Sequence, residues 1–385
     1  MSTSLTADLV RSATDRLPQI LADLERVISV ETPSHDKTAV ARGAADFAAL
    51  LKERLGAEAE LITVDGTTHV RLRFGTGPAR VVLVNHQDTV WPHGTLDRIP
   101  FSTADGLVRG PGCFDMLTGA IMSIHATAIL GEHLGEAALD GLSILITGDE
   151  EIGSVTSSEL IRAEAAEARA VYVMEASAGG ALKLERKGTS MYTLVFRGRA
   201  SHAGLEPEKG INAGMALALT LPAVADIADA EAGTTVVPTV ISAGTTTNTV
   251  PAEAHVDIDV RARTAAELER VDAAIRTLAT RPPLEGSSVE VLGGINRPPF
   301  EPERSAGLFD RAVALAADLG IAAPTGVAVG GASDGNFTAG DGIATLDGLG
   351  AVGDGAHAEH EHAVIDEIPP RTALLAALIA DQLGA

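Results

Sequence analysis

The sequence predicts an α/β protein in which a mostly parallel sheet lies between layers of helices, with an α+β domain inserted in mid-chain. Three observations support this fold. Short apolar runs alternate with segments of helical periodicity, several of these runs end in polar residues, and the middle of the chain has its own β-α-β-β-α-β order. A chain of 385 residues is long enough for two domains.

The first part of the chain predicts helices and strands in alternation. Helical periodicity covers residues 5–30 and 39–56, and further helices are expected over 117–134 and 157–167. Apolar runs in this part are rich in β-branched residues and show little alternation, which predicts strands buried on both faces of a parallel sheet. These runs are residues 61–64, 70–74, 81–85, 142–147 and 170–174.

The middle and last parts complete two domains. Strands are expected at 191–199, 235–243, 254–261 and 288–292, with helices at 211–227 (kinked at Pro222) and 265–279. After a proline-rich exit, helices are expected at 306–319 and 371–383 and strands at 327–329 and 344–346. We therefore expect one discontinuous domain, residues 1–187 and 297–385, interrupted by an inserted domain at 188–296.

Composition and charge exclude several classes of function. The net charge of −23 disfavours nucleic acid and anionic membrane surfaces as partners, because both require neutralisation of phosphates. No apolar run approaches the roughly 20 residues needed to cross a bilayer. The first 20 residues lack the pattern of a signal peptide, and Cys113 is the only cysteine, so no intrachain disulfide can form. We expect a cytoplasmic protein.

The first candidate site follows the strand at 81–85, which ends in His86 and Asp88. Residues two apart on a strand share a face, so the carboxylate can support an imidazole that binds a ligand. Asp115 follows a tight turn at 110–112 and precedes a helix. It is either a helix N-cap or a carboxylate that bridges two metal ions with its two oxygens.

Two further strands also end in acids. The strand at 142–147 is followed by Asp149, Glu150 and Glu151, which form either a solvated acidic loop or a pair in which one glutamate binds a cation while its neighbour acts as a general base. Glu175 follows the strand at 170–174. The loop at 355–362 contains His357, His360 and His362 and is either a metal-binding tract or an ordinary loop.

Taken together, these residues predict a two-metal hydrolase. Two histidines and three acids supply nitrogen and oxygen ligands without a thiolate, which suits zinc, with cobalt or manganese as alternative occupants. An aspartate between two pairs of terminal ligands is typical of two-metal sites, and it leaves Glu150 to deprotonate a bridging water. The ligand set is His86, Asp115, Glu151, Glu175 and His357.

The segments that contain these candidate residues, taken in their order along the chain, resemble the motifs of the dizinc aminoacylase and carboxypeptidase family that includes bacterial glutamate carboxypeptidase. The resemblance implies a zinc-exopeptidase-like fold with a ferredoxin-like lid that also forms a dimer. It implies that His86, Asp115 and Glu175 bind one zinc and that Asp115, Glu151 and His357 bind the other. It further implies that Asp88 orients His86 and that Glu150 is the general base.

The resemblance also implies roles for residues outside the metal ligands. His202, in Arg199-Ala200-Ser201-His202-Ala203-Gly204, would stabilise the oxyanion, often across a dimer interface; otherwise it is an ordinary surface-loop histidine. Asn248 and Arg261 would hold the substrate, although Arg261 could instead be a solvated residue paired with Asp259. Gly331 and Ser333 belong to a loop whose backbone would line the pocket.

These observations predict a homodimeric metallopeptidase that cleaves an amide bond, releasing C-terminal glutamate or aspartate from an N-acyl amino acid or short peptide. The rival within the same family is a deacylase of N-acetyl or N-succinyl amino acids, or a dipeptidase. The rival from another class is an inactive, metal-binding dimeric relative, which would have no physical need for two adjacent glutamates.

Overall fold

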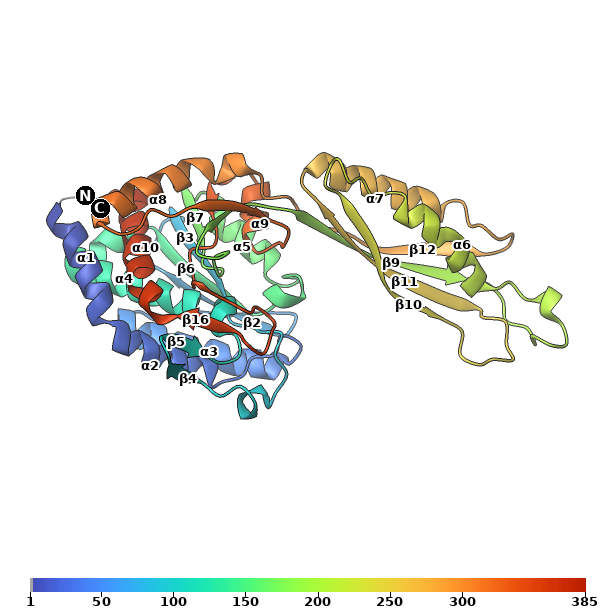
Figure 1. Cartoon of the computed structure of the whole chain (residues 1–385), viewed down its shortest axis with the longest axis horizontal. Helices are drawn as coiled ribbons and strands as arrows, with labels where there is room; N and C mark the ends of the chain where they lie inside the picture. The colour runs from blue at the N-terminus through green and yellow to red at the C-terminus, as the bar shows by residue number, and fades with distance from the viewer. Residues whose placement is uncertain (1–2) are drawn as a thin grey trace. The chain divides into compact units, whose positions relative to one another are not determined.

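The structure, a computed structural model, describes residues 3–385, with side chains from residue 6 onward. The chain forms two compact units (Figure 1). Unit 1 comprises Met1–Glu185, Glu301–Val329 and Ser333–Ala385. Unit 2 comprises Arg186–Phe300 and the short segment Gly330–Ala332. The insertion thus begins and ends within a few residues of the expected 188–296, but three residues of a later loop also belong to it.

The central sheet of unit 1 has six strands in the order β1-β2-β6-β3-β7-β14. Strands β6, β3, β7 and β14 are parallel neighbours, whereas β1 and β2 pair antiparallel at one edge. The prediction of a mostly parallel sheet is therefore confirmed. The strands are β1 (Glu60–Val64), β2 (Thr67–Arg73), β3 (Val81–His86), β6 (Leu142–Thr147), β7 (Ala170–Val173) and β14 (Thr345–Leu346).

Helices cover both faces of this sheet. Val81 and Leu83 of β3 pack into a large core with α4 and α10, while Val82 and Val84 pack on the other face with Ala165 of α5. Every residue of β3 and β6 is buried, as continuous apolar strands require. The helices are α1 (Thr3–Asp15), α2 (Leu17–Ile28), α3 (Lys37–Leu55), α4 (Thr118–Leu134), α5 (Ser158–Ala165), α8 (Ala306–Leu319), α9 (Gly335–Gly340) and α10 (Ile368–Leu383).

The expected single helix over residues 5–30 is wrong, because the chain breaks into α1 and α2 at Arg16. Pro18 lies in the first turn of α2, where a missing N–H is tolerated but continuation of the preceding helix is not. The apolar periodicity runs through the break, which explains why the pattern alone suggested one helix.

Several short strands lie outside the central sheet; of these, only the strand at 327–329 was expected from the sequence. The segment 327–329 falls in β13 (Gly326–Val329), which pairs with β8 (Leu182–Arg186) instead of joining the central sheet. A second small sheet, in the order β15-β16-β5-β4, holds the loop that carries His357 between β15 and β16. Its strands are β4 (Ser102–Ala104), β5 (Leu107–Arg109), β15 (Gly353–Asp354) and β16 (His362–Val364).

Unit 2 is the expected ferredoxin-like domain. Its four antiparallel strands lie in the order β10-β11-β9-β12, and two helices pack against them. Helix α6 continues only to Ala225, three residues past Pro222. In chain order the elements are β9 (Gly188–Arg197), α6 (Ala213–Ala225), β10 (Thr235–Ala243), β11 (Glu253–Ala262), α7 (Ala265–Ala279) and β12 (Ser288–Arg297).

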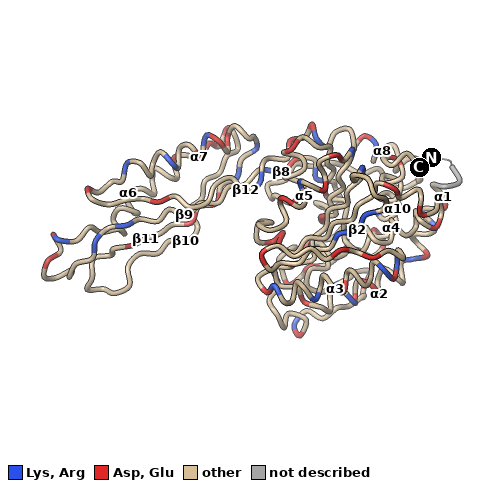
Figure 2. The backbone as a smooth tube through the Cα atoms, turned by 180° about the vertical axis from the view of Figure 1, so that it is seen from behind, with Lys and Arg blue, Asp and Glu red and all other residues tan. Residues whose placement is uncertain are grey.

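Hydropathy and charge follow the fold. Contrary to the expectation from the sequence, one helical stretch among the described residues, Cys113–Leu134, is long and apolar enough to span a membrane; 94% of its 18-residue apolar window is buried within the protein, as in the core helix of a folded domain. Acidic residues are spread along both units (Figure 2) and outnumber basic ones by 52 to 29.

A buried ion network joins three helices of unit 1. The carboxylate of Asp23 on α2 is 3% exposed and accepts two hydrogen bonds from the Arg54 guanidinium on α3, at 2.8 and 2.6 Å. It also contacts His125 Nε2 on α4 at 2.8 Å. Burial opposes ionisation of Asp23, but Arg54 and His125 outweigh it and lower its pKa to about 2. The ionised carboxylate therefore holds α2, α3 and α4 together.

We expect Asp23→Asn to lower the free energy of unfolding of the metal-free protein by about 3 kcal/mol at pH 7, because it leaves Arg54 without its buried partner. The native pKa of Asp23 lies below the ordinary 3.8, so its contribution is complete above pH 4 and disappears as the pH falls toward 2. Urea unfolding of both proteins from pH 7 to pH 2 measures this. Glu132→Gln, which removes an exposed partner of Arg16, is the control. A difference that does not change with pH would contradict the assignment.

Candidate active site

The site forms where neighbouring parallel strands end. His86 is the last residue of β3, Glu150 and Glu151 lie in a short 3-10 helix after β6, and Glu175 follows β7 by two residues. Because β6, β3 and β7 are parallel neighbours, their carboxyl ends meet at one edge of the sheet. The structure therefore brings residues far apart in sequence to one place, as ligand sites in open α/β sheets require.

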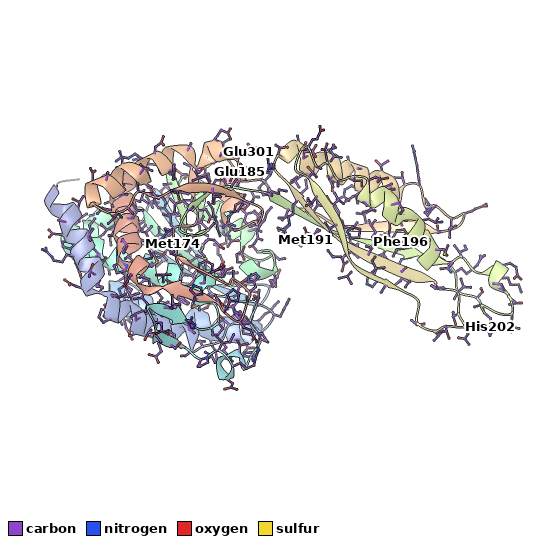
Figure 3. The ribbon with its side chains drawn as sticks, viewed as in Figure 1. Met174, Glu185, Met191, Phe196, His202 and Glu301 are labelled. Carbon is purple, nitrogen blue, oxygen red and sulfur yellow. The ribbon has the colours of Figure 1, made fainter. Side chains whose placement is uncertain are left out.

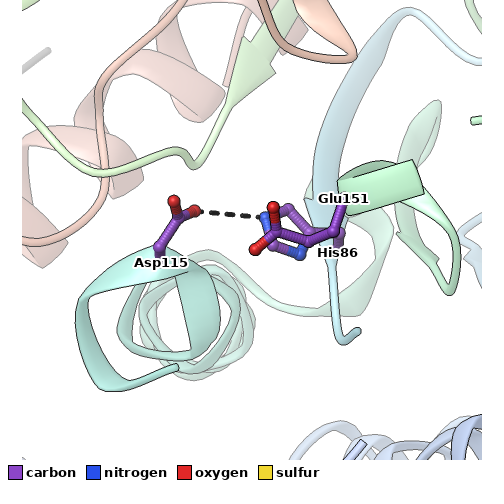
Figure 4. Close-up of side chains that lie close together, drawn as sticks. All are labelled: His86, Asp115 and Glu151. Atoms are coloured by element: carbon purple, nitrogen blue, oxygen red, sulfur yellow. Dashed lines mark hydrogen bonds and ion pairs between the residues drawn. The ribbon is translucent and has the colours of Figure 1, made fainter. Parts of the chain in front are cut away.

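Asp115 lies between the two histidines. Its Oδ1 is 3.3 Å from His86 Nε2 (Figure 4), and its Oδ2 is 3.5 Å from His357 Nε2. The two oxygens of the Asp115 carboxylate thus face two different imidazoles, His86 on one side and His357 on the other. Asp115 is not a helix N-cap, because α4 begins three residues later, with Leu117 as its N-cap residue.

Glu175 and Glu151 complete the two sides. Glu175 Oε1 is 3.6 Å from His86 Nε2, and Glu151 Oε2 is 3.1 Å from His357 Nε2. Glu151 Oε1 is buried and has no hydrogen-bond partner within residues 3–385. A buried carboxylate oxygen without a donor calls for a cation, and the nitrogen and oxygen set around it suits a borderline divalent metal. These residues therefore fit a bound metal.

The electrostatics of the site favour positive charge. Burial opposes protonation of His86, but Asp115, Asp88 and Glu150 raise its pKa well above the ordinary value. Hydrogen bonds to Asp115 and Glu151 raise the pKa of His357 to about 10. The same acids that stabilise a proton on imidazole would stabilise a metal ion in its place.

Asp88 departs from its expected role. His86 Nδ1 lies 2.9 Å from the main-chain carbonyl of Asp88, whereas the Asp88 carboxylate is 3.7 Å away. The chain turns after β3, so the carboxylate instead accepts the main-chain N–H groups of Glu150 and Glu151, at 3.1 and 3.2 Å, and the Ser34 hydroxyl at 2.7 Å. The carbonyl orients the imidazole with Nε2 toward Asp115, and the carboxylate fixes both glutamates.

The three consecutive acids after β6 have different surroundings. Asp149 turns away and accepts hydrogen bonds from the main chain and hydroxyl of Thr156 and from the Ser157 hydroxyl. Glu150 is buried, and one of its oxygens lies within 4.8 Å of ligand atoms of His86 and Glu175. Glu150 and Glu151 therefore both face the centre of the site, while Asp149 stabilises the loop.

Two predicted lid residues, His202 and Asn248, lie together in unit 2. The main-chain N–H of Ala203 donates to the Asn248 carbonyl at 2.9 Å. Nδ1 of His202 accepts the main-chain N–H groups of Gly204 and Leu205, both at 3.1 Å. This tautomer leaves the proton on Nε2, so His202 is an exposed hydrogen-bond donor.

Arg261 lies at the opposite end of the same sheet. It is level with Thr189 at the start of β9, whereas His202 lies beyond Arg197 at the end of that strand (Figure 3). The eight steps along the strand from Thr189 to Arg197 span roughly 27 Å at 3.4 Å per residue. The guanidinium of Arg261 donates two hydrogen bonds to Asp259, the partner considered as its alternative role.

Gly331 and Ser333 are expected to line the pocket with their main chain, and the structure shows where the Ser333 side chain lies. Ser333 is fully buried and its hydroxyl donates to Asp347 at 2.6 Å, so its side chain stabilises unit 1 and cannot touch substrate. The carbonyl of Gly331 accepts a hydrogen bond from Arg186 at 3.1 Å. A local motif predicted the loop but could not show which way the serine turns.

Sequence reasoning did not assign a role to two residues near the site. Lys183 Nζ is 3.7 Å from Glu175 Oε2, so it adds a positive charge beside that carboxylate. Glu361 accepts hydrogen bonds from the main chain of Gly112, Phe114 and Asp115. Its only signal in the sequence is its position four residues after His357, and nothing in the sequence signals Lys183.

Comparison with known proteins identifies a family and individual relatives that match most of the chain. Residues 82–381 match the family described as peptidase family M20/M25/M40. The chain is 32% identical over 390 residues to carboxypeptidase G2 of Pseudomonas sp. (strain RS-16), covering 98% of this chain and 92% of that protein. It is 30% identical over 312 residues to succinyl-diaminopimelate desuccinylase of Bordetella avium (strain 197N), covering 74% and 79%.

Solved structures show the same fold. An M20 family metallo-carboxypeptidase from Sulfolobus solfataricus has a TM-score of 0.76 at 16% identity, covering 95% of this chain and 99% of that one. A tripeptidase from Staphylococcus aureus has a TM-score of 0.74 at 18% identity, covering 96% and 99%. At these identities the likeness concerns the fold alone.

The fold and the cluster of histidines and acids together define a metal-dependent peptidase. The match over most of the chain gives the family: the protein belongs to peptidase family M20/M25/M40.

Proposed function

We propose that the protein is a dizinc hydrolase that releases C-terminal glutamate or aspartate from N-acyl amino acids or short peptides. The position of Asp115 carries this proposal, because its two oxygens face two histidines from opposite sides. His86, Glu175 and Asp115 would hold one zinc, and His357, Glu151 and Asp115 the other. Cobalt or manganese would suit the same ligands.

The reaction follows from the chemistry of these residues. Zinc, when bound there, lowers the pKa of water and polarises the carbonyl of the scissile amide. Glu150 takes a proton from the attacking water and returns it to the leaving nitrogen. The Nε2–H of His202 donates to the oxyanion as negative charge develops on the carbonyl oxygen.

Release of a C-terminal amino acid is supported by the likeness to carboxypeptidase G2, and the preference for an acidic one is supported by Arg261. A guanidinium binds a carboxylate through two parallel hydrogen bonds, and Arg261 already makes such a pair with Asp259. We propose that the substrate carboxylate takes over part of this pairing and that Asn248 binds the substrate carbonyl.

A cavity in unit 1 supports an uncharged acyl group. It has a volume of about 450 Å³ and reaches the metal ligand Glu151. Its described lining contains no lysine or arginine, so an anionic acyl group such as succinyl would find no counter-ion there. The other lining residues are Pro33, Ser34, His35, Asp36, Thr89, Val90, Pro92, His93 and Ile152.

Hydrolysis of a substrate panel by the zinc-loaded protein tests this function. We expect N-acetyl- and N-benzoyl-glutamate to have kcat/KM values about tenfold or more above N-succinyl-glutamate and N-acetyl-lysine. Faster release of succinate would instead support the desuccinylase that the relatives of that name suggest. No hydrolysis of any member by protein with full metal content would identify an inactive relative.

We also propose that two copies pair through unit 2. Strand β10 is an edge strand, so one row of its main-chain groups has no neighbouring strand within the described sheet. Apolar side chains on β10 and the adjacent helix α6 are about half exposed, which favours burial against a second copy. They are Met215, Leu219, Val237, Val240 and Ile241.

The remaining proposals concern the binding partners and the cellular location of the protein. The surplus of acids disfavours nucleic acid and anionic membranes as partners. Cys113, the single cysteine, is buried and forms no disulfide, which is consistent with the cytoplasmic location that we propose.

A further inference from the structure

We propose that Glu361 is a positioning residue for metal binding: it fixes the turn that carries Asp115 and so sets where the oxygens of Asp115 point. The inference rests on the metal site of the proposed function but not on its substrate. Glu361 is 1% exposed. A carboxylate at such a buried position would be strongly unfavourable if it had no hydrogen-bond partners.

Four N–H donors surround this carboxylate. Its Oε1 accepts the main-chain N–H groups of Phe114 at 2.9 Å and Asp115 at 3.1 Å. Its Oε2 accepts the main-chain N–H of Gly112 at 2.9 Å and the indole N–H of Trp91 at 2.8 Å. Each oxygen thus receives two hydrogen bonds, which suits a carboxylate because it accepts and does not donate.

The turn needs this support because it is not a regular helix. Asp115 and Met116 have φ/ψ values of −117°/96° and −129°/30°, so the helical hydrogen-bond pattern is interrupted there. The N–H groups of Gly112, Phe114 and Asp115 therefore take Glu361 as their acceptor. Without it, three buried main-chain donors would lose their partner and the turn would move to find others.

Glu361 also connects the two sides of the site. It belongs to the same loop as the ligand His357, between β15 and β16. Two hydrogen bonds make that loop compact, from Ala358 N–H to the Gly355 carbonyl at 2.8 Å and from Glu361 N–H to the Ala358 carbonyl at 2.9 Å. One short loop therefore supplies the histidine ligand His357. Through Glu361 the same loop holds the main chain at Asp115, whose carboxylate faces His357.

The test is binding of Co²⁺ to the full-length, metal-free protein, followed by visible absorption and without substrate. Glu361→Gln keeps the size of the side chain but replaces an acceptor oxygen with an amide that faces two N–H donors. We expect its affinity for Co²⁺ to be weaker by about tenfold or more, as for other residues that orient metal ligands. Its circular dichroism should match that of the wild type.

Two further variants separate positioning from charge and from folding. Glu359→Gln removes the same charge from the same loop, but Glu359 is exposed and pairs with Arg98, so its affinity should stay within about twofold of wild type. Trp91→Phe removes one of the four donors without changing charge, and we expect about threefold weaker binding. If Glu361→Gln does not fold, the Co²⁺ affinity of Trp91→Phe tests the positioning role in its place.

Unchanged Co²⁺ affinity in a folded Glu361→Gln protein would overturn the proposal, even if its thermal stability fell. Equal weakening in Glu359→Gln would also overturn it, because charge alone would then explain the effect. Since no substrate is present, an error in the proposed substrate would not affect these results.

Discussion

Glu150→Gln is expected to bind metal as the wild type does and to lose roughly a thousandfold in kcat, within the range for removal of a general base. The amide has nearly the shape of the carboxylate but cannot accept a proton from water. Metal content by elemental analysis and kcat with an N-acyl glutamate measure the two effects separately.

Asp115→Asn provides the contrast, because an amide offers one good ligand oxygen where Asp115 has two. We expect this variant to lose metal and activity together. The comparison matters because an oxygen of Glu150 lies within 4.8 Å of ligand atoms of His86 and Glu175, so a ligand role for Glu150 is a real alternative. Loss of metal from Glu150→Gln would show that Glu150 is a ligand and would require a different base.

The second large effect is complementation between two inactive variants. Within one unit 2, His202 and Arg261 are separated by the length of strand β9, so one small substrate cannot touch both. If each site combines Arg261 of one copy with His202 of the other, His202→Ala and Arg261→Ala should each lose most activity. The whole population of dimers formed from the two variants should then regain about a quarter of the wild-type activity, because about half the dimers are mixed and each of these has one intact site of two.

Co-expression of the two variants with the same affinity tag purifies mixed and unmixed dimers together, and assay of this population measures the recovery. His255→Ala is a suitable control, because His255 lies on the same sheet and its imidazole hydrogen-bonds to the Ser242 hydroxyl, away from His202 and Arg261 in sequence. Activity of the mixture no higher than that of either variant would contradict a site shared between two copies.

Much of the fold could be predicted because its signals are local. The buried strands β3, β6 and β7 contain almost only apolar residues, and each is followed by polar residues that have to lie at the same sheet edge. That these histidines and acids lie close together could be predicted for the same reason, since their types and order along the chain are themselves informative.

What could not be predicted depends on how side chains turn. Ser333 lies in the expected loop but is buried against Asp347, and Asp88 lies beside His86 but directs its carboxylate to Glu150 and Glu151. Spacing along the chain does not show which of two nearby groups a carboxylate or hydroxyl meets. The break between α1 and α2 was missed because apolar periodicity continues through it, whereas Pro18 and backbone geometry end the helix.

The insertion of unit 2 has a consequence for synthesis on the ribosome. The chain leaves unit 1 at Glu185 and returns at Glu301, so the strand β14, the buried helix α10 and His357 are all made after the whole insertion. Unit 2 contains all six of its main elements in one continuous stretch and can fold as soon as it emerges. Unit 1 must wait with its core open, although the acids of the site have already been synthesised. The last 85 residues, Glu301–Ala385, therefore close the core and supply His357 in one late step, so that a truncated chain would lack both a closed core and the second histidine of the site.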